Sequence, residues 1–123
     1  MTNTTYNRMV VSLDTVINHD HVFAALADAT RRDIVFRALG GHEGVVELAG
    51  HYRMSFAGVQ KHVAVLERAG LVTKERTGRR KVVRTNIEAL RLARGLLDQY
   101  EALWRGRVER MTDLITASEE PRP

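Results

Sequence analysis

The sequence contains no cysteine among its 123 residues. This absence excludes disulfides, thiolate metal sites, iron–sulfur clusters and cysteine nucleophiles, and it predicts a cytoplasmic protein. No apolar run approaches the ~20 residues that span a bilayer. The N-terminus, MTNTTYNRMVVSL, also lacks the basic start and long apolar stretch of a signal peptide. We therefore expect neither secretion nor membrane insertion.

Catalytic motifs are absent as well. The chain has no G-x-S-x-G, no glycine-rich phosphate loop and no H-E-x-x-H. Its 123 residues, of which 44% are hydrophobic and 28% charged, leave room for one compact soluble domain. We expect a protein that is not an enzyme and that needs no cofactor.

Positive charge is present in excess and is unevenly distributed. Residues 1–60 hold 5 basic and 6 acidic side chains, for a charge of −1, whereas residues 61–123 hold 14 and 9, for +5. Within residues 74–84, KERTGRRKVVR, 6 of the 11 positions are Lys or Arg. Such clustering favours a polyanionic partner, although a solvated hairpin tip would also carry it.

Apolar residues recur every three or four positions near both ends of the chain, which predicts amphipathic helices over residues 6–19 and 87–117. Together the two stripes exceed what one small core needs, so we expect them to form a dimer interface. The predicted interface residues are Tyr6, Met9, Val10, Leu13, Ile17, Leu97, Tyr100, Trp104, Val108, Met111 and Ile115.

Between these stripes the sequence predicts two shorter helices. Asp20 is a candidate N-cap for the first, and Asp28 for a second that runs from Ala29 to about Leu39 and stops at the Gly40-Gly41 pair. The expected buried positions of the second helix are Ile34, Val35, Ala38 and Leu39.

The segment 45–69 predicts a helix, a short turn and a second helix. Residues 45–52 suffice for about two helical turns, and Ser55 is a good N-cap for a helix that runs to Ala69 and ends at Gly70. Two β-branched runs follow within residues 71–86, and Thr77-Gly78 between them predicts a hairpin turn. The basic cluster would therefore lie on a β-hairpin.

This order predicts a mainly α fold with a small β-hairpin, the winged helix-turn-helix, in which the second helix of the pair enters the DNA major groove. We expect a single domain over residues 1–118 and a disordered tail over 119–123. The predicted DNA-binding residues are Ser55, Phe56, Ala57, Gln60, Lys61 and His62 on the helix, and Lys74, Arg76, Arg79, Arg80 and Lys81 on the wing.

Three runs resemble the ArsR/SmtB family of bacterial winged-helix transcriptional regulators: LADATRRDIVFRAL (26–39), VVELAGHYRMSFAGVQKHVAVLERAGLV (45–72) and ERTGRRKVVRTN (75–86). The resemblance implies a homodimer that represses transcription from a near-palindromic operator and often controls its own operon.

Metal-sensing members of that family carry a cysteine pair where this sequence has Gly44 and Val46, or Asp and His ligands along the C-terminal helix, whereas His62 is the last histidine here. The Met-Ser-Phe entry to the recognition helix and the Trp-bearing C-terminal helix instead resemble a metal-independent subgroup. We therefore expect no metal, and the effector is unknown.

The sequence is also compatible with other functions. A ligand-responsive sensor could use a metal at His19, His21, His42 and His51, or a small molecule near Trp104 and Tyr100. A winged-helix adaptor could instead dock an acidic protein on its hairpin. His62 could contact a phosphate or pack between helices, and Phe56 could touch a thymine methyl or staple back onto the preceding helix.

Overall fold

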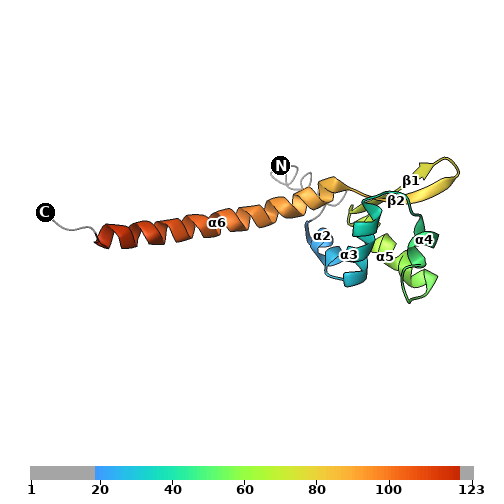
Figure 1. The fold of residues 1–123 in the computed structure, drawn as a ribbon, viewed down its shortest axis with the longest axis horizontal. Helices are drawn as coiled ribbons and strands as arrows, with labels where there is room; N and C mark the ends of the chain where they lie inside the picture. The colour runs from blue at the N-terminus through green and yellow to red at the C-terminus, as the bar shows by residue number, and fades with distance from the viewer. Residues whose placement is uncertain (1–18, 120–123) are drawn as a thin grey trace, which may run out of the picture. The chain divides into compact units, whose positions relative to one another are not determined.

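The computed structural model describes residues 19–119, which form two units, 19–93 and 94–119. The first unit contains the helices α2 (His19–Leu26), α3 (Ala29–Ala38), α4 (Val45–Ala49) and α5 (Phe56–Arg68) and an antiparallel hairpin of β1 (Val72–Thr77) and β2 (Arg80–Thr85) (Figure 1). Helix α6 (Ile87–Glu119) begins in the first unit and makes up the second. The mainly α fold with one hairpin, and its helix-turn-helix and wing, are as the sequence predicts.

Local capping chemistry sets the helix boundaries. Asp28 caps α3, with its Oδ1 accepting from the amide of Arg31 at 3.0 Å, and this hydrogen bond lowers the pKa of the Asp28 carboxyl. Ser55 caps α5 in the same way, with its Oγ accepting from the amide of Gly58 at 3.0 Å. Gly70, at φ 77°, ends the α5 region in the left-handed conformation that glycine adopts without strain.

The hairpin closes through a two-residue loop, Gly78-Arg79, with positive φ only at Gly78. Thr77 is the last residue of β1 and pairs with Arg80, so the turn lies one residue later than the predicted Thr77-Gly78. The register places Arg76 opposite Lys81 and Lys74 opposite Val83.

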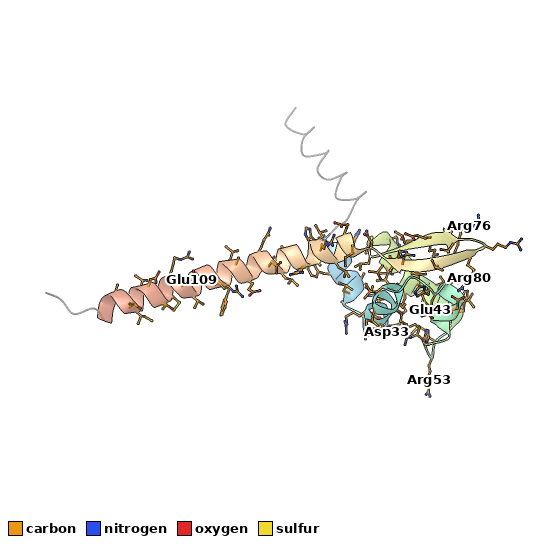
Figure 2. The ribbon with its side chains drawn as sticks, turned by 45° about the horizontal axis from the view of Figure 1, so that its top comes forward. Asp33, Glu43, Arg53, Arg76, Arg80 and Glu109 are labelled. Carbon is orange, nitrogen blue, oxygen red and sulfur yellow. The ribbon has the colours of Figure 1, made fainter. Side chains whose placement is uncertain are left out.

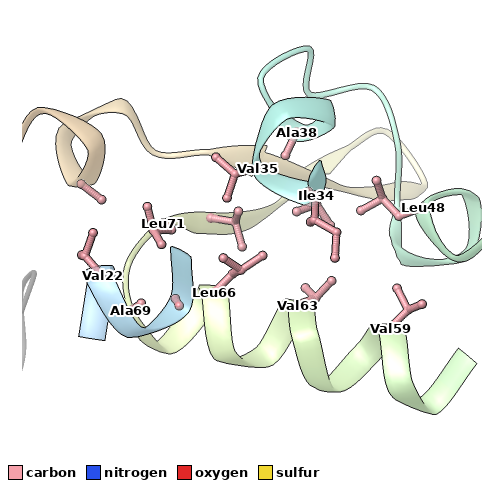
Figure 3. Packing of buried hydrophobic residues seen from close by; sticks show 14 of the residues in the cluster. Val22, Ile34, Val35, Ala38, Leu48, Val59, Val63, Leu66, Ala69 and Leu71 are labelled. Atoms are coloured by element: carbon pink, nitrogen blue, oxygen red, sulfur yellow. The ribbon is translucent and has the colours of Figure 1, made fainter. Parts of the chain in front are cut away.

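One hydrophobic core holds the first unit together (Figure 3). Every element of this unit contributes, including the first two turns of α6. Complete burial of a Leu, Ile or Val side chain stabilises a fold by about 1.5–3 kcal/mol. The side chains buried most deeply are Val22, Ile34, Leu48, Val59, Val63, Leu66, Leu71, Val72 and Val83.

Three details differ from the sequence-based expectations. Asp20 lies within the first turn of α2, where its charge complements the helix dipole, and is not an N-cap. Leu39, the C-cap of α3, is 54% exposed and does not join the core as expected, whereas Ile34, Val35 and Ala38 are buried as expected. Helix α4 ends at Ala49, since Gly50, a poor helix former, stands at its C-cap.

In the second unit, the large apolar side chains of α6 are exposed, among them Leu97, Tyr100, Trp104 and Met111. The helix reaches Glu119, two residues past the predicted end at Ala117, and so includes the first residue of the predicted tail. The predicted helix over residues 6–19 lies outside the described residues except for His19, as do residues 120–123 of the tail. None of the helices within residues 19–119 is long and apolar enough to cross a membrane.

Candidate nucleic-acid interface

Helix α5 has one buried and one exposed side. Val59, Val63 and Leu66 are buried in the core, and α4 packs beside α5. The residues that the sequence assigns to DNA recognition lie on the other side and are exposed: Ser55, Phe56, Ala57, Gln60 and Lys61. Because most of these side chains are small or polar, this face can approach the floor of a major groove ~12 Å wide.

The wing presents a pair of like charges. Arg76 and Lys81 lie directly opposite each other across the two strands, and both are exposed. Directly opposed like charges destabilise a sheet. Within residues 19–119, neither side chain has a hydrogen-bond or ion-pair partner, nor does Arg79 in the loop. These three cations are placed where a polyanion would relieve their repulsion.

The remaining cations of the hairpin have partners inside the protein. Lys74 Nζ lies 3.8 Å from Glu67 Oε1 of α5, and Arg84 Nε lies 2.7 Å from Glu75 Oε2 on the neighbouring strand. Arg80, which the sequence assigns to the DNA backbone, donates from Nη2 to Glu47 Oε1 of α4 at 2.5 Å. Figure 2 shows Arg80 on the α4 side of the hairpin.

His62 is partly buried on α5 rather than displayed on its exposed face. Its Nδ1 accepts from Arg31 Nη1 at 3.3 Å, and the same guanidinium donates to the carbonyl oxygens of Ala25 at 2.7 Å and Ala24 at 3.1 Å. This contact matches the interpretation of His62 as a packing residue between helices. Phe56, in contrast, keeps 45% of its surface exposed at the start of α5.

Sequence reasoning missed Arg53, which lies in the turn between α4 and α5. Its side chain is exposed and extends from that turn (Figure 2), and it has no polar partner among the described residues. A lone arginine in a predicted turn carries little signal in the sequence, because the sequence does not show whether its side chain is exposed or paired within the protein.

A polar contact fixes the same turn to α3. Tyr52 donates its hydroxyl hydrogen to Asp33 Oδ2 at 2.6 Å, and Arg37 Nε donates to the same oxygen at 2.8 Å. The hydrogen bonds from Tyr52 and Arg37 lower the pKa of Asp33, while burial and the nearby carboxylate raise the pKa of Tyr52.

Known proteins with similar sequences or structures are regulators of transcription. No protein-family model matches the sequence. The chain is 38% identical over 81 residues to the uncharacterized HTH-type transcriptional regulator YuzN of Bacillus subtilis, covering 60% of this chain and 88% of that protein. It is 36% identical over 88 residues to the HTH-type transcriptional regulator Rv2034 of Mycobacterium tuberculosis, covering 72% and 82%.

Solved structures that are similar to this chain are also transcriptional regulators. An ArsR-like transcriptional regulator from Rhodococcus sp. RHA1 superposes with a TM-score of 0.69 at 27% identity, covering 78% of this chain and 91% of the other. A crystal structure of an ArsR family transcriptional regulator gives a TM-score of 0.64 at 30% identity, covering 70% and 89%. The chain belongs to the ArsR family. As an ArsR-family member it is a transcriptional regulator of a non-enzymatic, DNA-binding class.

Gly44 and Val46 occupy the positions at which the family resemblance places the cysteine pair of metal-sensing members, and neither has a ligating side chain. Gly44 has no side chain, and a Cβ added there would lie 2.6 Å from the carbonyl oxygen of Lys81, closer than real Cβ atoms approach. Val46 is exposed and apolar. His51 Nε2 lies 2.6 Å from Glu43 Oε2, but no three His, Asp or Glu side chains of residues 19–119 gather around one point.

Proposed function

We propose that this ArsR-family protein is a cytoplasmic homodimeric repressor that reads an inverted-repeat operator, acts without a metal and regulates its own gene. The observation that carries the DNA-binding part is the Arg76–Lys81 pair with Arg79 in the adjoining loop, three cations without a partner in the described chain, in the same unit as the exposed face of α5. Phosphate neutralisation supplies most sequence-independent affinity for DNA.

The two parts of the surface have different tasks in this proposal. Base edges and the nearest phosphates are contacted by Ser55, Phe56, Ala57, Gln60 and Lys61 of the α5 region. Arg76, Arg79 and Lys81 of the wing contact flanking phosphates, with Lys74 beside them and Arg53 as a further candidate. His62 stabilises α5 from its partly buried side through its hydrogen bond with Arg31.

Selection of bound sequences from a random duplex library tests this function. The expected product is an inverted repeat whose half-sites are about one helical turn, ~34–36 Å, apart, because a twofold dimer places its two recognition helices in successive major grooves. Recovery of unenriched sequences would contradict the proposal and favour the adaptor alternative.

The homodimer is supported by the apolar stripe of α6. Leu97, Tyr100, Trp104, Val108 and Met111 recur at spacings of three and four, which is the pattern of a helix–helix seam, and all are exposed in the single chain. Sedimentation equilibrium of the purified protein tests this part. A mass twice the 13.9 kDa of one chain is expected, whereas a monomer at micromolar concentration would contradict the proposed homodimer.

Metal independence is supported by Gly44, where no ligand side chain fits without displacement of the wing backbone. Calorimetric titration with Zn²⁺ tests it. We expect no stoichiometric binding in the micromolar range and the same operator affinity with chelator present. Sub-micromolar binding at one ion per chain would contradict the proposal.

A further inference from the structure

Arg80 differs from the other basic residues near the hairpin loop in having two partners, one in α4 and one in the loop before it. Its Nη2 donates to Glu47 Oε1 at 2.5 Å and to the carbonyl oxygen of His42 at 3.3 Å. Because neighbouring residues of a strand point to opposite faces, the side chain of Arg80 lies on the other face of the hairpin from those of Lys81 and Arg76.

Glu47 is itself held in place. Its second carboxylate oxygen, Oε2, accepts from the backbone amide of Gly44 at the start of α4. The wing and α4 also touch through their backbones, since the amide of Val83 donates to the carbonyl of Glu43 at 2.8 Å. Arg80 therefore ends a short network that joins the loop end of β2 to the first helix of the helix-turn-helix.

We propose that Arg80 is a positioning residue and that Glu47 is its partner: the pair holds the wing at a fixed angle to α4, so that Arg76, Arg79 and Lys81 meet the phosphates, while Arg80 itself contacts none. This inference rests on the proposed DNA-binding function and assigns to Arg80 a role different from the one that its charge alone suggests. Glu47, an acidic residue close to a surface for a polyanion, thereby strengthens DNA binding.

Substitution of Glu47 separates this role from simple electrostatics. Glu47→Gln removes a negative charge near DNA, yet the glutamine amide oxygen can still accept from Gly44. If charge alone mattered, the variant would bind DNA more tightly. If the pair positions the wing, Glu47→Gln and Arg80→Ala each weaken binding about two- to fivefold, the range that an exposed ion pair allows.

The salt dependence of binding gives the second readout. Operator affinity is measured by fluorescence anisotropy of the labelled duplex across a series of NaCl concentrations. Each phosphate contact contributes about 0.9 to the slope of log K against log salt. Arg80→Ala is expected to leave this slope unchanged, whereas the matched control Arg79→Ala, at the neighbouring residue without a partner, lowers it by about 0.9 per chain.

A double variant and a charge exchange complete the test. Glu47→Gln with Arg80→Ala is expected to bind no more weakly than either single variant, because both remove the same contact. Glu47→Arg with Arg80→Glu is expected to bind more tightly than Arg80→Glu alone. Thermal unfolding of each variant confirms that the fold is retained.

Two other results separate failure of this inference from failure of the proposed DNA-binding function. A reduced slope for Arg80→Ala together with tighter binding by Glu47→Gln would overturn the inference, because it would show that Arg80 leaves Glu47 for a phosphate. Loss of salt-dependent duplex binding in the unmodified protein would overturn the proposed function itself.

Discussion

At the scale of single residues, the change in the free energy of unfolding on substitution distinguishes side chains that serve binding from side chains that serve folding. Lys81 faces Arg76 directly, and neither side chain has an ion-pair partner among the described residues. Such a pair costs stability in the free protein and is useful only when an anion is present.

Lys81→Ala is therefore expected to leave the free energy of unfolding unchanged or to raise it by up to about 1 kcal/mol. The same variant is expected to weaken binding to all duplexes and to lower the salt slope by about 0.9 per chain. Urea unfolding and anisotropy measure the two effects. A less stable protein with an unchanged slope would show that Lys81 serves the fold.

Gln60 is the residue of the exposed α5 face best suited to read a base, because its amide can bond to adenine N6 and N7 together. Gln60→Ala is expected to relax preference at one or two operator positions, with a cost of about 1–3 kcal/mol for the preferred base. The control is Lys61→Ala, which should weaken all sequences alike. Uniform weakening by Gln60→Ala would remove Gln60 from base readout.

At the scale of elements, the contact between Tyr52 and Asp33 couples the helix-turn-helix to α3 and makes stability depend on pH. Asp33 has a pKa below its usual value in the folded protein, chiefly because Tyr52 donates to it. A group with a lowered folded pKa contributes stability that is fully present above its unfolded pKa, about 3.9, and that is lost as the pH falls through the folded value.

Tyr52→Phe is expected to lower the free energy of unfolding at pH 7 by about 1 kcal/mol, the usual contribution of one hydrogen bond. Because the pKa of Asp33 would then lie closer to its unfolded value, the variant should also lose less stability between pH 5 and pH 3 than the parent. Urea titrations at several pH values measure both effects. If the free energy of unfolding changes with pH in the same way in both proteins, Tyr52 does not set the pKa of Asp33.

The elements that the sequence predicts well are those whose ends depend on local chemistry. Asp28 and Ser55 cap their helices, and Gly70 and Gly78 take up the left-handed conformation, because each needs only its near neighbours. The partner of Arg80 could not be predicted in this way. Glu47 is 33 residues away, and only the packing of the wing against α4 brings the two together.

Burial was predicted least well at the ends of elements. The periodicity places Leu39 in line with buried residues of α3, but Leu39 is the C-cap of the helix and its side chain is exposed, because periodicity does not show where the neighbouring elements stop covering a helix. For the candidate site, the sequence predicts which residues carry charge. It does not show which charges are neutralised within the protein, and that distinction separates Arg80 from Arg79.

At the scale of the whole molecule, the proposed repressor requires two copies of the chain. Trp104 lies in the apolar stripe of α6 and is 63% exposed in the single chain. Trp104→Glu is expected to weaken dimerisation by about 2 kcal/mol or more, since buried tryptophans commonly dominate interfaces. The control, Gln99→Glu, adds the same charge at an exposed position outside the stripe. Equal masses for both variants in sedimentation equilibrium would place the interface elsewhere.

Operator binding should follow the state of association. A dimer occupies both half-sites at once, so Trp104→Glu is expected to bind the full inverted repeat no more tightly than an isolated half-site, in contrast to the parent protein. Anisotropy with full-site and half-site duplexes measures this difference.

The most direct test of the account is the ratio of two affinities, one for the selected inverted repeat and one for a scrambled duplex of the same length, measured at physiological salt. If α5 reads base edges while the wing binds phosphates, the inverted repeat should bind about 10³-fold or more tightly, the lower end of the range for specific DNA-binding proteins. Equal affinities for the two duplexes would contradict the account.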